Sequence, residues 1–206
     1  MVRDGIYYAT ALTAAGALIA YLGGAWLASP VWVVALFCLY FFRDPDREIP
    51  PGPVAVSPAD GKVVAVVGAG SDAQRVSIFL NIFDVHVNRT PIAGSISKVE
   101  YRQGRFHVAS RAEAVDQNER NVVTVEGDGA TVVFQQVAGL IARRIVCSKK
   151  PGDTVTAGER IGLIKFGSRV DVMFGPEWEI AVRPGMRVAA GSSVIARRRS
   201  QDTHGT

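Results

Sequence analysis

The spacing of hydrophobic and polar positions changes near residue 43. No charged residue occurs from Gly5 to Phe42, whereas the rest of the chain consists of short apolar and alternating stretches separated by Gly, Pro, Asn and Asp. Long uncharged apolar stretches are typical of membrane-associated helices, and an alternation with period two is typical of strands with one buried face. The pattern therefore predicts an apolar helical segment followed by a mainly β domain.

Ser29-Pro30 divides the apolar segment, because proline cannot continue a helix and restricts the residue before it. We expect two helices, Gly5–Ala28 and Val31–Phe42. At 1.5 Å per residue they would be about 36 Å and about 18 Å long, so the second is too short to cross a bilayer core of about 30 Å. The prediction for residues 1–42 is a helical hairpin that enters one leaflet of a membrane.

A signal peptide is the alternative, with Arg3 as its charged region and cleavage near Ala28. The first helix is longer than a usual signal-peptide apolar region, and residues 31–42 would remain as an apolar tail. The membrane anchor is therefore preferred. A charged, proline-rich linker at 43–53 would join it to a β domain at 54–206.

Alternating or apolar stretches bounded by turn residues predict the strands of this domain. They are Lys62–Val67, Val76–Leu80, Ser95–Tyr101, Val122–Glu126, Thr131–Val137, Ile161–Phe166 and Arg169–Phe174. The glycines around Asp128 predict a hairpin turn between the fourth and fifth of them. In the last strand, Val170, Val172 and Phe174 share one face and Arg169, Asp171 and Met173 the other, which predicts a half-buried strand.

An internal repeat lies in the second half of the domain. Residues 151–158 and 184–191 share the pattern Pro-Gly-x-x-Val-x-Ala-Gly. Each copy predicts a turn, a short strand, a second turn and a following strand. The pattern resembles the half-motifs of lipoyl and biotinyl carrier domains, so we expect a barrel-sandwich β domain with quasi-twofold symmetry. No lysine occupies a hairpin tip, which argues against a carrier function.

Charge and cysteine content narrow the possible partners. The net charge of +4 favours anionic partners, but no nucleic-acid-binding motif is present, so an anionic membrane suits the chain better. Cys38 and Cys147 are far apart in different kinds of segment, which is unlike a disulfide framework or a metal site. Both are interpreted as buried small hydrophobic residues.

Three positions could carry chemistry. Gly167-Ser168 lies between two extended stretches, where glycine would let its carbonyl turn toward the serine hydroxyl for attack on the preceding peptide bond. An arbitrary Gly-Ser pair in a strand is more often a bulge or packing site. His86 is one of three histidines, the usual acid or base near neutral pH. Asp60 belongs to an Asp-Gly turn that enters a strand.

The strings around these residues resemble one family. They are Ser-Pro-Ala-Asp-Gly at 57–61, Asp-Val-His-Val-Asn-Arg-Thr-Pro at 84–91, Asn-Glu-Arg at 118–120, Val-Ala-Gly-Leu-Ile-Ala-Arg-Arg at 137–144 and Phe-Gly-Ser-Arg at 166–169. In this order they resemble phosphatidylserine decarboxylase proenzymes of the short, archaeal-type bacterial form. The family's commonest cleavage string is Leu-Gly-Ser-Thr, so only the central Gly-Ser pair matches it strictly.

This resemblance implies a self-cleaving, pyruvoyl-dependent enzyme. The bond between Gly167 and Ser168 would break to give a β chain, 1–167, and an α chain, 168–206, whose first residue becomes a pyruvoyl group. That group would form a Schiff base with phosphatidylserine and release carbon dioxide, leaving phosphatidylethanolamine. His86 would transfer the protons and Asp60 would orient it.

One departure from the family concerns this histidine. Longer members have two histidines three residues apart, and the second position is Arg89 here. Either His86 serves both maturation and turnover, or another residue shares the work. His107 is the reserve candidate, although no motif surrounds it.

The implied partners are a phospholipid membrane, phosphatidylserine and the second cleaved chain, with a homo-oligomer left open. The implied location is the cytoplasmic face of the cell membrane, as a peripheral or monotopic protein. Two other classes remain as alternatives. One is a non-catalytic, membrane-tethered barrel-sandwich adaptor module, and the other is a pyruvoyl decarboxylase of a soluble amino acid, which would not need residues 5–42.

Overall fold

The computed structural model describes residues 2–104, 118–139, 145–165 and 168–199. The chain divides into two units, Met1–Asp46 and Arg47–Thr206.

The first unit is a hairpin of two helices, α1 (Arg3–Gly23) and α2 (Ala25–Phe41). They run antiparallel, since Val2 N donates to Phe42 O at 3.0 Å at the open end. Glycines on α1 allow the close approach: a Cβ added to Gly5 would lie 2.4 Å from the side chain of Phe42, and one added to Gly16 would lie 2.3 Å from that of Trp32. α1 is long and apolar enough to cross a membrane, but signal sequences and core helices of soluble proteins meet the same test of length and composition.

The predicted break at Ser29-Pro30 is wrong. The turn is at Gly24, whose φ of 94° favours glycine, and Pro30 lies inside α2. Proline lacks the N–H that would bond the carbonyl four residues earlier, that of Trp26. The Ser29 hydroxyl donates to that carbonyl instead, at 2.8 Å. Because the serine satisfies the freed acceptor, the helix continues through the proline.

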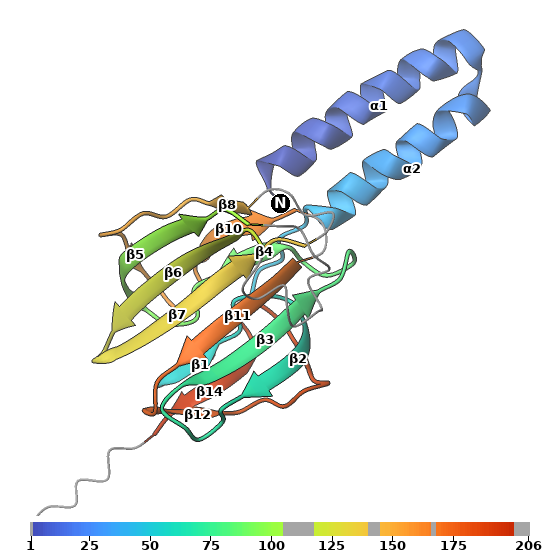
Figure 1. Cartoon of the computed structure of the whole chain (residues 1–206). Coiled ribbons are helices and arrows are strands. Elements are labelled where there is room, and N and C mark those ends of the chain that lie inside the picture. Colours follow the sequence, from blue (N-terminus) through green and yellow to red (C-terminus); the bar gives the residue numbers. More distant parts are fainter. Residues whose placement is uncertain (1, 105–117, 140–144, 166–167, 200–206) are drawn as a thin grey trace, which may run out of the picture. The chain divides into compact units, whose positions relative to one another are not determined.

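The described part of the second unit forms three antiparallel sheets (Figure 1). The large, curled sheet has the order β13 (Arg187–Val188), β2 (Gly61–Val67), β3 (Gln74–Leu80), β11 (Ser168–Phe174), β7 (Ala130–Val137), β6 (Arg120–Gly127), β5 (Gly94–Arg102) and β9 (Thr154–Val155). One small sheet has the order β1 (Val54–Val56), β14 (Val194–Arg198) and β12 (Trp178–Ile180). The other has the order β4 (Val87–Arg89), β10 (Arg160–Ile164) and β8 (Ile145–Cys147). The long strands lie where the alternation predicted them.

The internal repeat extends over this whole unit. The segment from β4 to β10 gives four strands to the large sheet and forms one small sheet, and the strands before and after it do the same. Matching glycines adopt matching backbone angles: φ is 150° at Gly61 and 154° at Gly94, and 92° at Gly152 and 96° at Gly185. The two halves are therefore related by a quasi-twofold arrangement, with β7 and β11 side by side at the centre.

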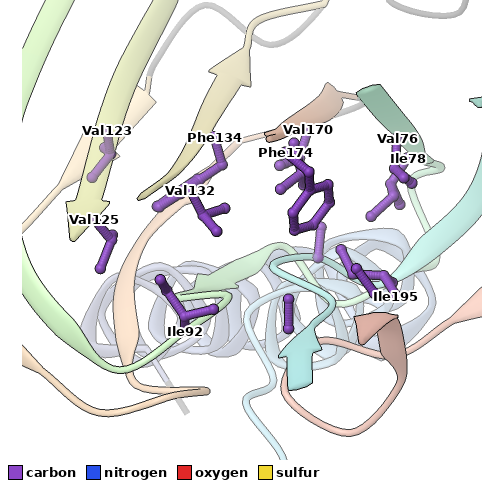
Figure 2. Packing of buried hydrophobic residues seen from close by; sticks show 14 of the residues in the cluster. Val76, Ile78, Ile92, Val123, Val125, Val132, Phe134, Val170, Phe174 and Ile195 are labelled. Atoms are coloured by element: carbon purple, nitrogen blue, oxygen red, sulfur yellow. The ribbon is translucent and has the colours of Figure 1, made fainter. Parts of the chain in front are cut away.

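The core lies between the large sheet and the two small ones. Figure 2 shows Val76, Val170 and Phe174 of the large sheet directed toward Ile92, next to β4, and Ile195 on β14. Burial of such side chains contributes about 1.5–3 kcal/mol each to folding.

The other face of β11 is also buried, so the prediction of a half-buried strand is wrong. Arg169 is 3% exposed and Asp171 0%. Arg169 Nε donates to Asp171 Oδ1 at 2.7 Å, and its Nη2 donates to Ser77 Oγ at 2.7 Å. Gln135 Nε2 donates to the second carboxylate oxygen at 3.3 Å. Charges can be buried here because each has a partner of opposite charge and further hydrogen bonds.

Asp171→Asn in a full-length Ser168→Ala chain should lower the free energy of unfolding by about 3–5 kcal/mol, because the buried charge of Arg169 would lose its ion pair with the Asp171 carboxylate. Denaturant titration in detergent measures this change. Glu100→Gln is the matched control, since Glu100 also lies between cations but on the surface, and should cost much less. Equal losses of unfolding free energy in the two variants would show that the buried ion pair stabilises the fold no more than the surface one.

Candidate active site

Ser168 is the first residue of the central strand β11 and is 0% exposed. Its Cα partner is Leu80, the last residue of β3. Among the residues that the structure describes, none forms a hydrogen bond with Ser168 Oγ. A buried hydroxyl without such a bond costs free energy, which makes Ser168 a candidate for a reactive position. Gly167, the other half of the predicted cleavage site, lies outside the described residues.

His86 directly precedes β4 and is 2% exposed. Its Nδ1 lies 2.9 Å from the backbone oxygen of Asp84. A carbonyl oxygen can only accept, so Nδ1 carries the proton and donates. In the neutral ring Nε2 therefore keeps its lone pair and can accept a proton. The backbone fixes the tautomer that a general base requires.

Two backbone connections bring His86 and Ser168 to the same end of the domain. Leu80 pairs with Ser168 and leads into the loop that ends at His86. Ile164, the last residue of β10, donates its N–H to His86 O at 3.3 Å and precedes Ser168 by a short connection. The nucleophile and base predicted from sequence are thus attached to neighbouring strand ends.

Asp60 is bonded to other groups in this structure. Its carboxylate accepts from Arg47 Nη2 at 3.0 and 2.9 Å, and Oδ1 also accepts from Ala190 N at 2.8 Å. The ring nitrogen Nδ1 of His86 is bonded to Asp84 O. That Asp60 orients His86 stays a prediction. His107, the reserve candidate, lies outside the described residues.

Comparison with known proteins identifies the family of this chain. The phosphatidylserine decarboxylase family model matches residues 34–196. The phosphatidylserine decarboxylase proenzyme of Solibacter usitatus is 71% identical over 198 residues, 96% of this chain and 97% of the relative. Those of Cupriavidus pinatubonensis (45%, 84% of this chain and 83% of the relative) and Solidesulfovibrio magneticus (44%, 96% of each) are also similar. The chain belongs to the phosphatidylserine decarboxylase family.

Arg89 occupies the position at which the resemblance to longer family members leads us to expect a second histidine. It is 6% exposed, and its Nη1 donates to Gly158 O at 3.0 Å in the turn of the internal repeat. Its backbone N–H donates to Pro58 O at 2.9 Å. Because a guanidinium stays protonated in proteins, Arg89 cannot act as a base. These contacts give it a structural role at the junction of the two halves.

A buried chain of amides is the main feature that the sequence did not reveal. Asn121 Nδ2 donates to Gln136 Oε1 at 3.0 Å, and Gln136 Nε2 donates to Asn88 Oδ1 at 2.8 Å. Gln136 is the β7 partner of Val170, two residues beyond Ser168. A neighbouring Asn118 donates to Ala138 O at 2.7 Å. The sequence signal that could have revealed this chain of amides is the presence of polar residues inside otherwise apolar strands.

The part of the chain that the structure describes contains no group of three or more metal-ligating side chains that could hold an ion. An open cavity of about 430 Å³ is lined by Gln74, Met173, Phe174 and their neighbours, at the opposite end of β3 and β11 from Leu80 and Ser168. His86 and Ser168 are not among its lining residues, so this cavity is not the candidate active site.

Nitrogen NMR of histidine-labelled, uncut Ser168→Ala protein tests the assigned tautomer. At a pH where the ring is neutral, His86 should carry its proton on Nδ1, because Asp84 O accepts it. The His86→Gln variant identifies the signal among the three histidines. A neutral ring protonated on Nε2 would contradict the assignment.

Proposed function

We propose that the chain is a phosphatidylserine decarboxylase proenzyme that cuts itself between Gly167 and Ser168. The family assignment supports the reaction, and the proenzyme names of its relatives support self-processing. The single observation that carries the assignment of Ser168 is its fully buried Oγ, which lacks a hydrogen bond among the described residues.

Maturation begins when His86 Nε2 takes the proton of Ser168 Oγ. The oxygen attacks the Gly167 carbonyl carbon, and the acyl group moves from nitrogen to oxygen to give an ester. Removal of the Ser168 Cα proton then expels the Gly167 carboxylate and leaves a dehydroalanine. Its imine tautomer is hydrolysed by water, which releases ammonia and leaves a pyruvoyl group at residue 168.

The pyruvoyl group supplies a carbonyl that condenses with the primary amine of phosphatidylserine and accepts electron density as carbon dioxide leaves. A buried serine at this position fits as its precursor. His86, at the same end of the domain, then returns a proton to the substrate carbon, so one side chain serves both stages. The products are phosphatidylethanolamine and carbon dioxide.

The two cleaved chains should remain associated as a heterodimer. The α chain would begin with β11, which pairs with β3 on one edge and β7 on the other, and both belong to the β chain. β14 pairs likewise with β1. We also assign the quasi-twofold domain to the barrel-sandwich folds.

We place the enzyme at the cytoplasmic face of the cell membrane, with the helical hairpin as its anchor. α1 is 21 residues long, about 32 Å, and α2 is 17 residues, about 26 Å. Such an anchor suits a substrate with two acyl chains, which does not leave a bilayer readily.

Intact-mass analysis of the purified chain tests the cleavage. The wild type should give fragments 1–167 and 168–206, and the smaller one should be lighter by one ammonia than a fragment that begins with serine. Ser168→Ala should remain a single chain, because alanine has no nucleophile. A folded, membrane-associated wild type that stays intact would refute the proposal and favour a non-catalytic adaptor.

His86→Ala should slow self-cleavage by about 10²-fold or more, the usual contribution of a general base. A time course of freshly synthesised precursor measures the rate. Asp60→Asn tests the orienting role, and Arg47→Ala is its control because Arg47 is the described partner of Asp60. If Asp60 matters only for its bond to Arg47, the two variants should behave alike. Unchanged cleavage in His86→Ala would exclude it as the base.

A further inference from the structure

The loop between β3 and β4, residues 81–86, exposes two adjacent apolar side chains. Ile82 is 39% exposed and Phe83 63%. The loop projects from the end of β3 (Figure 1). Most other isoleucine and phenylalanine side chains described in this unit belong to the core, although Ile49 is 38% exposed. Loops usually carry polar residues at such positions, so an exposed apolar pair at a loop tip indicates a binding surface.

Hydrogen bonds at its base hold the loop in this shape. Asn81 N donates to Asp84 Oδ2 at 2.9 Å, and Phe83 N donates to Asn81 Oδ1 at 2.8 Å. Asp84 N donates to Asn81 O at 3.0 Å, and the Asp84 side chain is also paired with Arg187. These bonds close a tight turn that satisfies the backbone and leaves the two apolar side chains outside it.

Cations border the apolar tip. Arg187 contacts Asp84, and its Cα partner in the sheet is Lys62. Both side chains are exposed, and Met186 beside them is 40% exposed. An apolar tip with a basic border is the arrangement that binds anionic bilayers: the apolar groups enter the acyl boundary and the cations meet lipid phosphates.

We propose that Ile82, Phe83 and Met186, with Lys62 and Arg187, form a docking surface for an anionic phospholipid bilayer. This inference rests on the proposed function. The tip lies within four residues of His86, and the Asp84 carbonyl at the loop's base binds His86 Nδ1. Docking of the loop therefore holds the base, and with it the Ser168 end of the domain, at the depth of the lipid head groups.

The first test compares two physical forms of the substrate. Ile82→Asp/Phe83→Asp in the full-length chain should mature normally, since both side chains are exposed. Its kcat/KM for phosphatidylserine in vesicles should then fall to about one tenth of the wild-type value or below. A loss of this size is typical when two interfacial anchors are removed. Activity on a monomeric short-chain phosphatidylserine should stay within about twofold of wild type, because that substrate needs no bilayer docking.

Val67→Asp is the matched control. Val67 is 49% exposed and lies at the far end of β2 from Lys62. It should keep wild-type activity on both substrates. Equal losses on vesicles in the control and the loop variant, or equal losses on both substrates in the loop variant, would overturn the docking surface.

A second test does not depend on activity. It therefore distinguishes a failure of the docking surface from a failure of the proposed function. The full chain carries Phe83→Cys with Cys38→Ser and Cys147→Ser, and a polarity-sensitive dye is attached at position 83. In phosphatidylglycerol vesicles, spin-labelled lipids should quench the fluorescence of this dye. The same dye attached through Val67→Cys should be quenched far less. Lys62→Gln should reduce the quenching. Lipid-independent cross-links between copies at position 83, without quenching, would instead assign the surface to a second copy of the chain.

Discussion

The central strand β11 has no free edge and no exposed face, and the arrangement of the candidate site follows from this. Its backbone pairs with β3 and β7, so its N–H and C=O groups are satisfied on both sides. Val170 and Val172 fill the core, while Arg169 and Asp171 neutralise each other behind the sheet. A strand held in this way keeps its position when the bond before its first residue is broken. Ser168 can therefore become a chain end without moving away from β3.

The quasi-twofold arrangement would allow the domain to tolerate the proposed cut. The segment from β4 to β10 is one half of the domain, inserted between the strands of the other half. The connection from β10 to β11 is where the chain leaves the inserted half, so the proposed cut falls between the halves and within neither. The glycines of the internal repeat allow the halves to meet closely: a Cβ on Gly158 would lie 3.5 Å from Gly191 Cα and 2.3 Å from Ile49.

The sequence predicted those strands and turns that depend on the residues within them and next to them. Alternation located β2, β3, β6, β7 and β11, and the Gly-Asp-Gly string located a turn in which φ is 49° at Asp128 and 68° at Gly129. Short strands such as β1 and β12 were missed, because pairing with distant residues rather than side-chain periodicity creates them. The helix break failed for a local reason of another kind: a serine hydroxyl replaced the missing proline donor.

In the candidate site too, features set by neighbouring residues could be predicted and features set by contacts between distant residues could not. The histidine and serine were predicted as candidates because their residue types and the strings around them point to chemistry. Their surroundings were not, because Asp60 with Arg47, and Asn121 with Gln136 and Asn88, meet only after folding. A periodic pattern also cannot distinguish a polar face that meets solvent from one buried around an ion pair. The sequence therefore assigned Arg169 and Asp171 to solvent.

The contacts of His86 bear on how one histidine could serve both maturation and turnover. A carboxylate behind a histidine fixes its tautomer and also stabilises the charged ring, whereas the Asp84 carbonyl is uncharged and fixes the tautomer with less stabilisation of the charge. Arg89 cannot take a proton and is committed to Gly158 O. A histidine with one fixed tautomer suits the proposed role, which first removes a proton from serine and later returns one to carbon.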